Sequence, residues 1–176
     1  MQNVERNHPS ELESSSETLV VPVSPVAKPR STRRDKFNPS KAVLKYRDFC
    51  DDFNAAAEKH GFTLGEAVSI CFYVPTPPSY SKRKAESLWG KPHQQRPDLD
   101  NFVKAVLDAP KQDDSHIWYL SVSKVWCAPI PGANRRYQGW IVVNNLRPSL
   151  ALCVAAKGLL SGVTDYLEYA ISKRTR

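Results

Sequence analysis

The chain has 176 residues, of which 41% are hydrophobic, so it is long enough for one domain with a compact core and tails. Its formal net charge of +7 favours an anionic partner, and nucleic acid is the commonest such partner of a soluble protein. The four cysteines are far apart in the sequence, which argues against a zinc site and against a disulfide framework.

Two further features bear on where the protein works. Residues 1–17 are polar and acidic and have no apolar stretch of the kind found in a secretory signal peptide. The longest apolar run, around residues 150–163, contains Lys157 and is too short to span a bilayer. We therefore expect a cytoplasmic protein that is not in a membrane.

The first third of the chain predicts a tail, a strand, a loop and a helix, in that order. Residues 1–17 have too few apolar groups to offset their ordering entropy, so we expect disorder. Residues 19–23 are β-branched and include a proline, which favours an edge strand. Residues 25–39 are rich in proline and basic residues and predict an extended loop, either a phosphate-binding segment or a linker. An apolar stripe then predicts a helix over residues 40–61.

The rest of the chain predicts three more strands and further helices. Strands are expected at residues 67–74, 117–126 and 137–143, the last pairing with its predecessor as a hairpin. Residues 82–89 predict a short helix, and an apolar stripe between Asp98 and Pro110 predicts an amphipathic one.

These elements predict an α/β (α+β) fold, with a small mixed sheet of about four strands packed against helices. The predicted organisation is a disordered acidic tail at residues 1–17, a folded domain at residues 18–145 and a helical extension at residues 146–176. Residues 91–97 are polar and irregular, so we expect His93 at the surface.

Charge is unevenly distributed along this domain. Residues 27–47 contain eight basic residues and one acidic residue, and residues 82–96 contain five basic and one acidic. Residues 98–114, in contrast, contain five acidic and two basic residues. A negative centre between basic segments is typical of a metal site that acts on a polyanion, although solvated surfaces also carry such charge runs by chance.

The acidic centre lies at the start of the amphipathic helix and at Asp113-Asp114. Asp98 is a good N-cap, and Asp100 and Lys104 are i, i+4 neighbours beside the apolar stripe. Carboxylates from Asp98, Asp100 and Asp114 could hold Mg²⁺ or Mn²⁺, which prefer oxygen ligands. Lys104 could then stabilise charge that develops on a phosphate. The alternative is a helix cap, a surface ion pair and turn residues, and a DxD pattern alone does not decide between them.

Lys124 interrupts the alternation of the strand at residues 117–126. It shares a face with four apolar residues, Trp118, Leu120, Val122 and Trp126. A lysine on a buried face is uncommon unless it is paired. The alternative is an edge lysine whose stem lies on apolar surface while its amine reaches water.

Together these motifs resemble a known family. The segments RPDLDN at residues 96–101, KAVLDA at residues 104–109 and DDS at residues 113–115 are similar to the signature of the RusA-type Holliday junction resolvases. The resemblance extends from about residue 19 to residue 143.

The resemblance implies a small α/β homodimer that cuts branched DNA, especially four-way junctions, in recombination and repair. It implies a divalent cofactor, Mg²⁺ or alternatively Mn²⁺, held by Asp98, Asp100 and Asp114. It gives Lys104 a catalytic role beside these aspartates, and it matches Lys124 to a further family lysine. The DNA contacts that we expect are Lys28, Arg30, Arg33, Arg34, Lys82, Arg83, Lys84, Lys91 and Lys124.

Two features depart from the family pattern. Residues 110–112 form a shorter connection to the acidic pair than is usual, and residues from about 146 onward have no counterpart in the compact family core. The short connection leaves open a second hypothesis, a junction-binding protein with a degenerate, inactive nuclease site. A third hypothesis is a metal nuclease directed at RNA or DNA flaps on the same scaffold.

Overall fold

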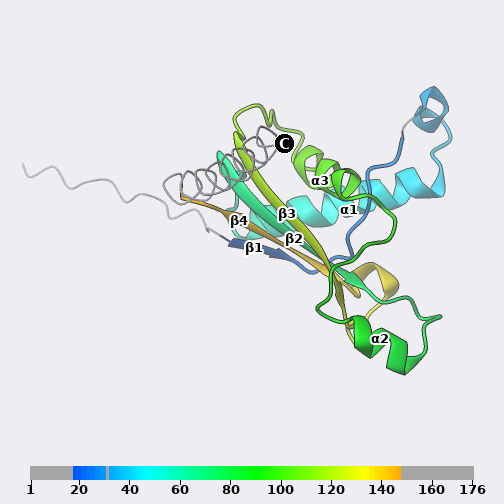
Figure 1. Ribbon diagram of the computed structural model, residues 1–176. Coiled ribbons are helices and arrows are strands. Elements are labelled where there is room, and N and C mark those ends of the chain that lie inside the picture. Colours follow the sequence, from blue (N-terminus) through cyan, green and yellow to red (C-terminus); the bar gives the residue numbers. More distant parts are fainter. Residues whose placement is uncertain (1–17, 31, 148–176) are drawn as a thin grey trace, which may run out of the picture.

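The computed structural model describes residues 18–30 and 32–147. The tail expected at residues 1–17 and nearly all of the extension expected at residues 146–176 lie outside the described residues. The described chain contains a four-stranded mixed sheet with α1 and α3 packed against it, and α2 lies in a lobe beyond one end of the sheet (Figure 1). The elements in chain order are β1 (Thr18–Val21), η1 (Arg33–Lys36), α1 (Lys41–Lys59), β2 (Ala67–Pro75), α2 (Lys82–Leu88), α3 (Leu99–Asp108), β3 (Tyr119–Cys127), η2 (Arg135–Tyr137) and β4 (Trp140–Asn145).

This arrangement confirms the predicted α+β fold with a small mixed sheet. The strand order is β1-β4-β2-β3. β2 and β3 run parallel, whereas β4 runs antiparallel to both of its neighbours, β1 and β2. The parallel pair requires a crossover, and α2 and α3 lie in that connection.

The predicted hairpin is wrong, because β4 pairs with β1 and β2 and not with its predecessor β3. Ile141 and Val143 are fully buried, which suits a strand inside the sheet. β3 lies at the sheet edge, where Leu120 is exposed and Val122 only half-buried. Alternating apolar residues identified both strands, but that pattern does not say which strands are neighbours.

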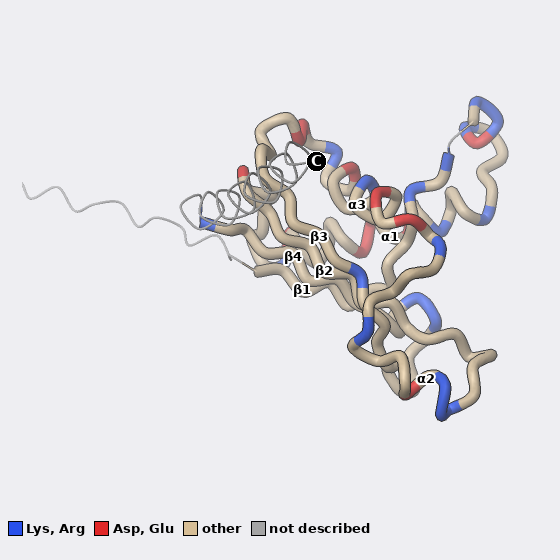
Figure 2. The backbone as a smooth tube through the Cα atoms, in the orientation of Figure 1, with Lys and Arg blue, Asp and Glu red and all other residues tan. Residues whose placement is uncertain are grey.

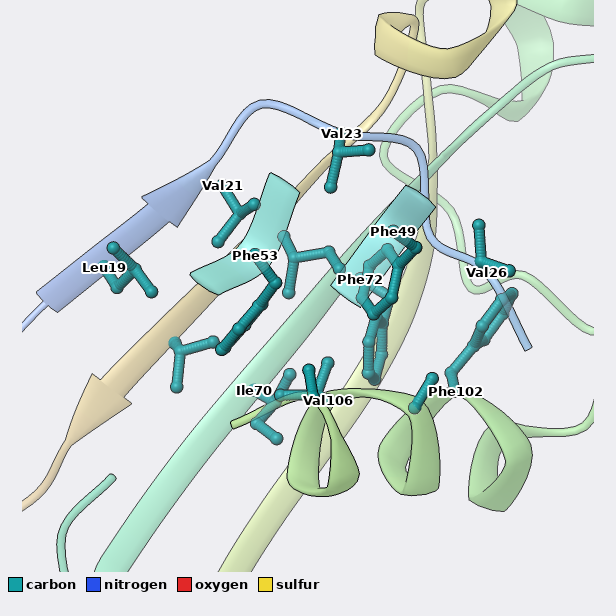
Figure 3. Packing of buried hydrophobic residues seen from close by; sticks show 14 of the residues in the cluster. Leu19, Val21, Val23, Val26, Phe49, Phe53, Ile70, Phe72, Phe102 and Val106 are labelled. Carbon is teal, nitrogen blue, oxygen red and sulfur yellow. The ribbon is translucent and has the colours of Figure 1, made fainter. Parts of the chain in front are cut away.

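The core lies between the sheet and the two larger helices. Phe49 and Phe53 of α1, Phe102 and Val106 of α3, and Phe72 of β2 are almost fully buried (Figure 3). The rings of Phe72 and Phe102 stack with centroids 5.2 Å apart. Burying a side chain of this size contributes about 1.5–3 kcal/mol, so this contact fixes α3 on the sheet.

The basic loop before α1 also differs in part from its prediction. Arg33 and Arg34 lie on the 3-10 helix η1 and not on an extended segment. Prolines exclude a long helix there, but the four residues between Thr32 and Phe37 contain none. Within residues 18–30 and 32–147, no helix has the length and hydropathy needed to cross a membrane.

Candidate functional site

The N-terminal end of α3 presents two carboxylates and one ammonium group. Asp98 is the N-cap residue, yet its side chain makes no capping hydrogen bond and is exposed. Asp100 lies in the first turn, and its Oδ2 accepts a 2.9 Å hydrogen bond from Lys104 Nζ. This bond is the main reason that the pKa of Asp100 is lowered below its ordinary value. The i, i+4 pairing predicted from the sequence is confirmed.

Lys124 supports this end of α3 from the neighbouring strand. The β2–β3 register pairs Lys124 with Phe72, so both lie on the helix-covered face of the sheet. The Lys124 ammonium donates 2.7 Å hydrogen bonds to the carbonyls of Gln95 and Pro97, and it lies 5.9 Å from the ring centroid of Phe102. These two hydrogen bonds to backbone carbonyls explain why a lysine lies among apolar residues, and the sequence did not identify them.

Asp114 lies away from Asp98 and Asp100. It lies in the loop after the C-terminal end of α3 and several residues before β3 begins. The ten residues of α3 span about 15 Å along the helix axis. The Asp114 carbonyl accepts a hydrogen bond from Ile117 N, and the adjacent His116 ring lies 3.2 Å from the carbonyl of Leu64, which precedes β2. The structure thus brings Asp98, Asp100 and Lys104 together at one end of α3 and leaves Asp114 near the other.

The neighbouring Asp113 has local partners. Its carboxylate accepts hydrogen bonds from the Ser115 backbone N–H and hydroxyl group, and these bonds lower the pKa of Asp113. In the part of the chain that the structure describes, no three His, Cys, Asp or Glu side chains form a group that could hold a metal ion. A cation at the start of α3 would therefore have two carboxylates from this chain.

The predicted DNA-binding residues Arg33 and Arg34 lie in a protruding segment, residues 32–40, which we call the first basic lobe (Figure 2). Both are exposed, as is Arg30, which precedes the lobe. Lys28 connects this part of the chain to α3, because its backbone N–H donates a 2.9 Å hydrogen bond to the carbonyl of Asn101. The Lys28 ammonium pairs with Asp108 on the same helix.

Residues 77–91 form the second basic lobe, which contains α2 (Figure 2). No residue of α2 is buried, and Lys82, Arg83, Lys84 and Lys91 are all exposed. The Lys84 ammonium lies 3.8 Å from the ring centroid of Tyr80. The chain leaves this lobe through residues 92–97 and enters α3, so the second lobe connects directly to the end of α3 that carries Asp98.

His93 is buried, which corrects the expected surface position. Its ring centroid lies 4.0 Å from that of Trp126, and its exposed fraction is 4%. Burial lowers the pKa of His93, and the Lys124 charge lowers it further. The polar sequence around His93 gave no periodic signal that could have revealed this burial, because the segment packs on Trp126 through tertiary contacts.

A site with this composition is suited to phosphate chemistry. Exposed carboxylates are ligands for hard divalent cations, and the positive lobes beside them can neutralise a polyanion. The family model described as "Endodeoxyribonuclease RusA" matches residues 22–134. The matched range includes the start of α3, both basic lobes, Asp114 and Lys124. A search of curated proteins finds no match.

Proposed function

Because the chain belongs to the RusA endodeoxyribonuclease family, we propose that it cleaves branched DNA, in particular four-way junctions, by metal-dependent phosphodiester hydrolysis. The observation that carries the proposal is the family match across residues 22–134, which contains the whole site. Recombination and repair are the processes that such an activity serves.

The residues at the start of α3 fit a divalent cation. Mg²⁺ is commonly bound by one or two carboxylates while it keeps several waters and contacts substrate phosphate, and Mn²⁺ accepts the same ligands. Asp98 and Asp100 supply two such carboxylates, and the Asp98 side chain has no competing capping bond. When bound, the cation polarises the phosphodiester and lowers the pKa of an attacking water.

Lys104 completes the catalytic group in this proposal. Its ammonium forms an ion pair with Asp100, and its side chain is 59% exposed to solvent. It can therefore reach a phosphate placed beside Asp100 and stabilise the negative charge that develops there. The same ion pair lowers the pKa of Asp100, which favours the ionised form that a metal ligand needs.

The two basic lobes would hold the DNA arms. Arg30, Arg33 and Arg34 lie in or beside the first lobe, and the second lobe carries Lys82, Arg83, Lys84 and Lys91. Phosphate contacts position a duplex without reading its sequence, which suits recognition of branched shape. Lys28 and Lys124, also expected to contact DNA, use their ammonium groups within the chain.

A homodimer would give Asp114 a place in the site. Within one chain α3 separates Asp114 from Asp98, so Asp114 of the partner subunit is the better candidate for a third carboxylate beside Asp98 and Asp100. A two-fold symmetric dimer also matches the pseudo-two-fold symmetry of a four-way junction and would place one site on each of two strands.

Incubating a synthetic four-way junction with the protein, with and without Mg²⁺, tests the activity. We expect paired cuts near the branch point only with the cation, and we expect Asp98→Asn to abolish cutting while binding is retained. Asp51 is an exposed aspartate on α1, so the variant Asp51→Asn is the matched control and should cut normally.

Full cleavage by Asp98→Asn would overturn the assignment, and binding without product at any Mg²⁺ or Mn²⁺ concentration would identify a binding protein with an inactive site. Duplex, flap and RNA competitors measure the substrate preference.

Mixing two inactive variants tests the shared site. If Asp114 acts across the dimer, a heterodimer of Asp98→Asn and Asp114→Asn contains one intact site and one doubly substituted site. Such a mixture should nick the junction on one strand after subunit exchange, although each variant alone is inactive. If Asp114 acts within its own chain, every site carries one lesion and the mixture stays inactive.

A further inference from the structure

Phe37 stands out on the first basic lobe because its side chain has almost no protein neighbours. It is 85% exposed, the highest value among the large apolar residues that are exposed in the described chain. Figure 1 shows the lobe projecting from the body of the molecule beyond the N-terminal end of α1. An isolated phenyl ring at such a position contributes nothing to the core, and its exposed face is free to contact a partner.

The backbone around Phe37 is held in place although the ring is free. The N–H groups of Phe37 and Asn38 both donate to the carbonyl of Arg34, at 3.0 and 2.9 Å. The carboxylate of the buried Asp35 accepts hydrogen bonds from the hydroxyl and backbone N–H of Thr32, both 2.7 Å, and from the backbone N–H of Ser40 at 3.1 Å. The three hydrogen bonds to Asp35 join Thr32 at the beginning of the lobe to Ser40 at its end.

The charge of Asp35 persists over the whole physiological pH range. The Thr32 hydroxyl hydrogen bond, followed by the backbone hydrogen bonds, lowers the pKa of Asp35 to about 2. Arg47 on α1 donates a further hydrogen bond to the Asp35 carbonyl at 3.4 Å. The lobe is therefore a preorganised support for the exposed ring, and little ordering entropy is lost when the ring binds.

The surroundings of the ring indicate what it binds. Arg33, Arg34 and Lys36 precede it, and the Lys36 ammonium lies 5.8 Å from the ring centroid. Two copies of so basic a lobe would repel each other, whereas a nucleic-acid backbone would attract it. Proteins that bind single DNA strands combine cations that neutralise the phosphates with aromatic rings on which bases stack, and this lobe has both.

We propose that Phe37 is a wedge that stacks on a nucleobase exposed at the branch point of the DNA, with the adjacent cations holding the flanking phosphates. This inference rests on the proposed function, since it requires a branched DNA substrate. Inside a continuous duplex, both faces of every base pair are stacked on neighbouring pairs. At an open branch, the last base pair of an arm has one unstacked face, on which an apolar side chain can stack. Phe37 would thus favour junctions over duplexes, which phosphate contacts alone do not distinguish.

Four-way junctions that carry 2-aminopurine in place of one adenine test this inference. Binding is measured by anisotropy and base unstacking by 2-aminopurine fluorescence, both in EDTA so that no cleavage occurs. With the wild-type protein we expect a several-fold rise in fluorescence when the probe adjoins the branch and none when it lies in the middle of an arm. Phe37→Ala should abolish the rise and weaken junction binding about tenfold, while duplex binding is unchanged.

Two variants serve as controls. Phe37→Tyr retains an aromatic face and should keep the rise, and Val20→Ala removes an exposed apolar side chain on β1 and should behave like the wild type. A full fluorescence rise with Phe37→Ala would overturn the wedge. An equal loss of junction and duplex affinity, or a change in sedimentation mass without a change in fluorescence, would also overturn it, the second result identifying a protein contact.

The outcomes separate this inference from the proposed activity. A junction that shows the Phe37-dependent rise but is never cut with Mg²⁺ or Mn²⁺ would support the wedge and overturn the nuclease assignment. A junction that is cut equally well by the wild type and by Phe37→Ala, with equal fluorescence, would support the nuclease and overturn the wedge. A wild-type protein that binds none of these DNAs would overturn both.

Discussion

Lys124 on β3 donates a 2.7 Å hydrogen bond to the carbonyl of Pro97, the residue directly before Asp98. A second 2.7 Å bond to the Gln95 carbonyl makes the ammonium a bridge between the sheet and the segment that enters α3. The position of the Asp98 carboxylate relative to the sheet therefore depends on a lysine that the sequence suggested as a DNA contact.

Replacing this lysine separates the two roles. Lys124→Met keeps the apolar stem but removes two charge-assisted hydrogen bonds, so we expect the free energy of unfolding to fall by about 1–3 kcal/mol in urea titrations. Cleavage should fall as well, because Asp98 is held less firmly. Lys82→Met is the control, since the side chain of Lys82 is 90% exposed and should leave the urea midpoint unchanged. An unchanged midpoint for Lys124→Met together with weaker junction binding would show that Lys124 acts on DNA directly.

The Asp100–Lys104 pair should matter to catalysis far more than to stability. Both side chains are about 60% exposed, and exposed i, i+4 ion pairs contribute little to stability because water and salt screen them. Lys104→Met should therefore unfold almost like the wild type, while the cleavage rate falls about 100-fold or more through loss of charge stabilisation. It should also raise the pKa of Asp100, which NMR titration of the carboxylate can follow, because Lys104 is the main cause of its lowering. If Lys104→Met cleaves at the wild-type rate, Lys104 has no catalytic role.

The basic lobes should control the salt dependence of DNA binding. Replacing both Arg33 and Arg34 by alanine should reduce the slope of log affinity against log salt by about 0.9 for each phosphate contact that is lost. The loss should be similar for different DNA sequences, because phosphate contacts do not read bases. Lys59→Ala, at the far end of α1, is the control. An unchanged slope in the double variant would exclude the first lobe from the interface.

His93 should make the protein less stable as the solution becomes more acidic. Burial lowers the pKa of His93 below its ordinary value of 6.5, so the unfolded chain binds a proton more readily than the folded chain does. Above about pH 6.5 the imidazole is neutral in both states and its titration does not change stability. As the pH falls from there towards the folded-state pKa, stability is lost.

Urea midpoints between pH 5 and 8 measure this effect. The decline between pH 6.5 and 5 should be steeper for the wild type than for His93→Gln, which stays neutral and retains the same carboxylates. Parallel curves for the two proteins would contradict the assignment.

The local pattern of the sequence was sufficient to predict α3 and the charged groups at its N-terminal end. The apolar stripe of α3 is confirmed by the burial of Phe102 and Val106, and the spacing of Asp100 and Lys104 produces the observed ion pair. Such features depend on helical geometry within a few residues, which the sequence determines directly. The RPDLDN motif likewise identified the family that the match over residues 22–134 shows.

Only the tertiary structure decided the arrangement across the sheet. β4 lies between β1 and β2, Lys124 reaches the Pro97 carbonyl, His93 is buried against Trp126, and Asp114 follows the opposite end of α3 from Asp98. Each of these depends on packing between segments that are distant in the chain, or on the direction in which a helix carries the chain. The periodicity of the sequence determines which side of a helix or strand is apolar. The packing of the whole core determines which other element covers that side and how far apart the charged groups lie.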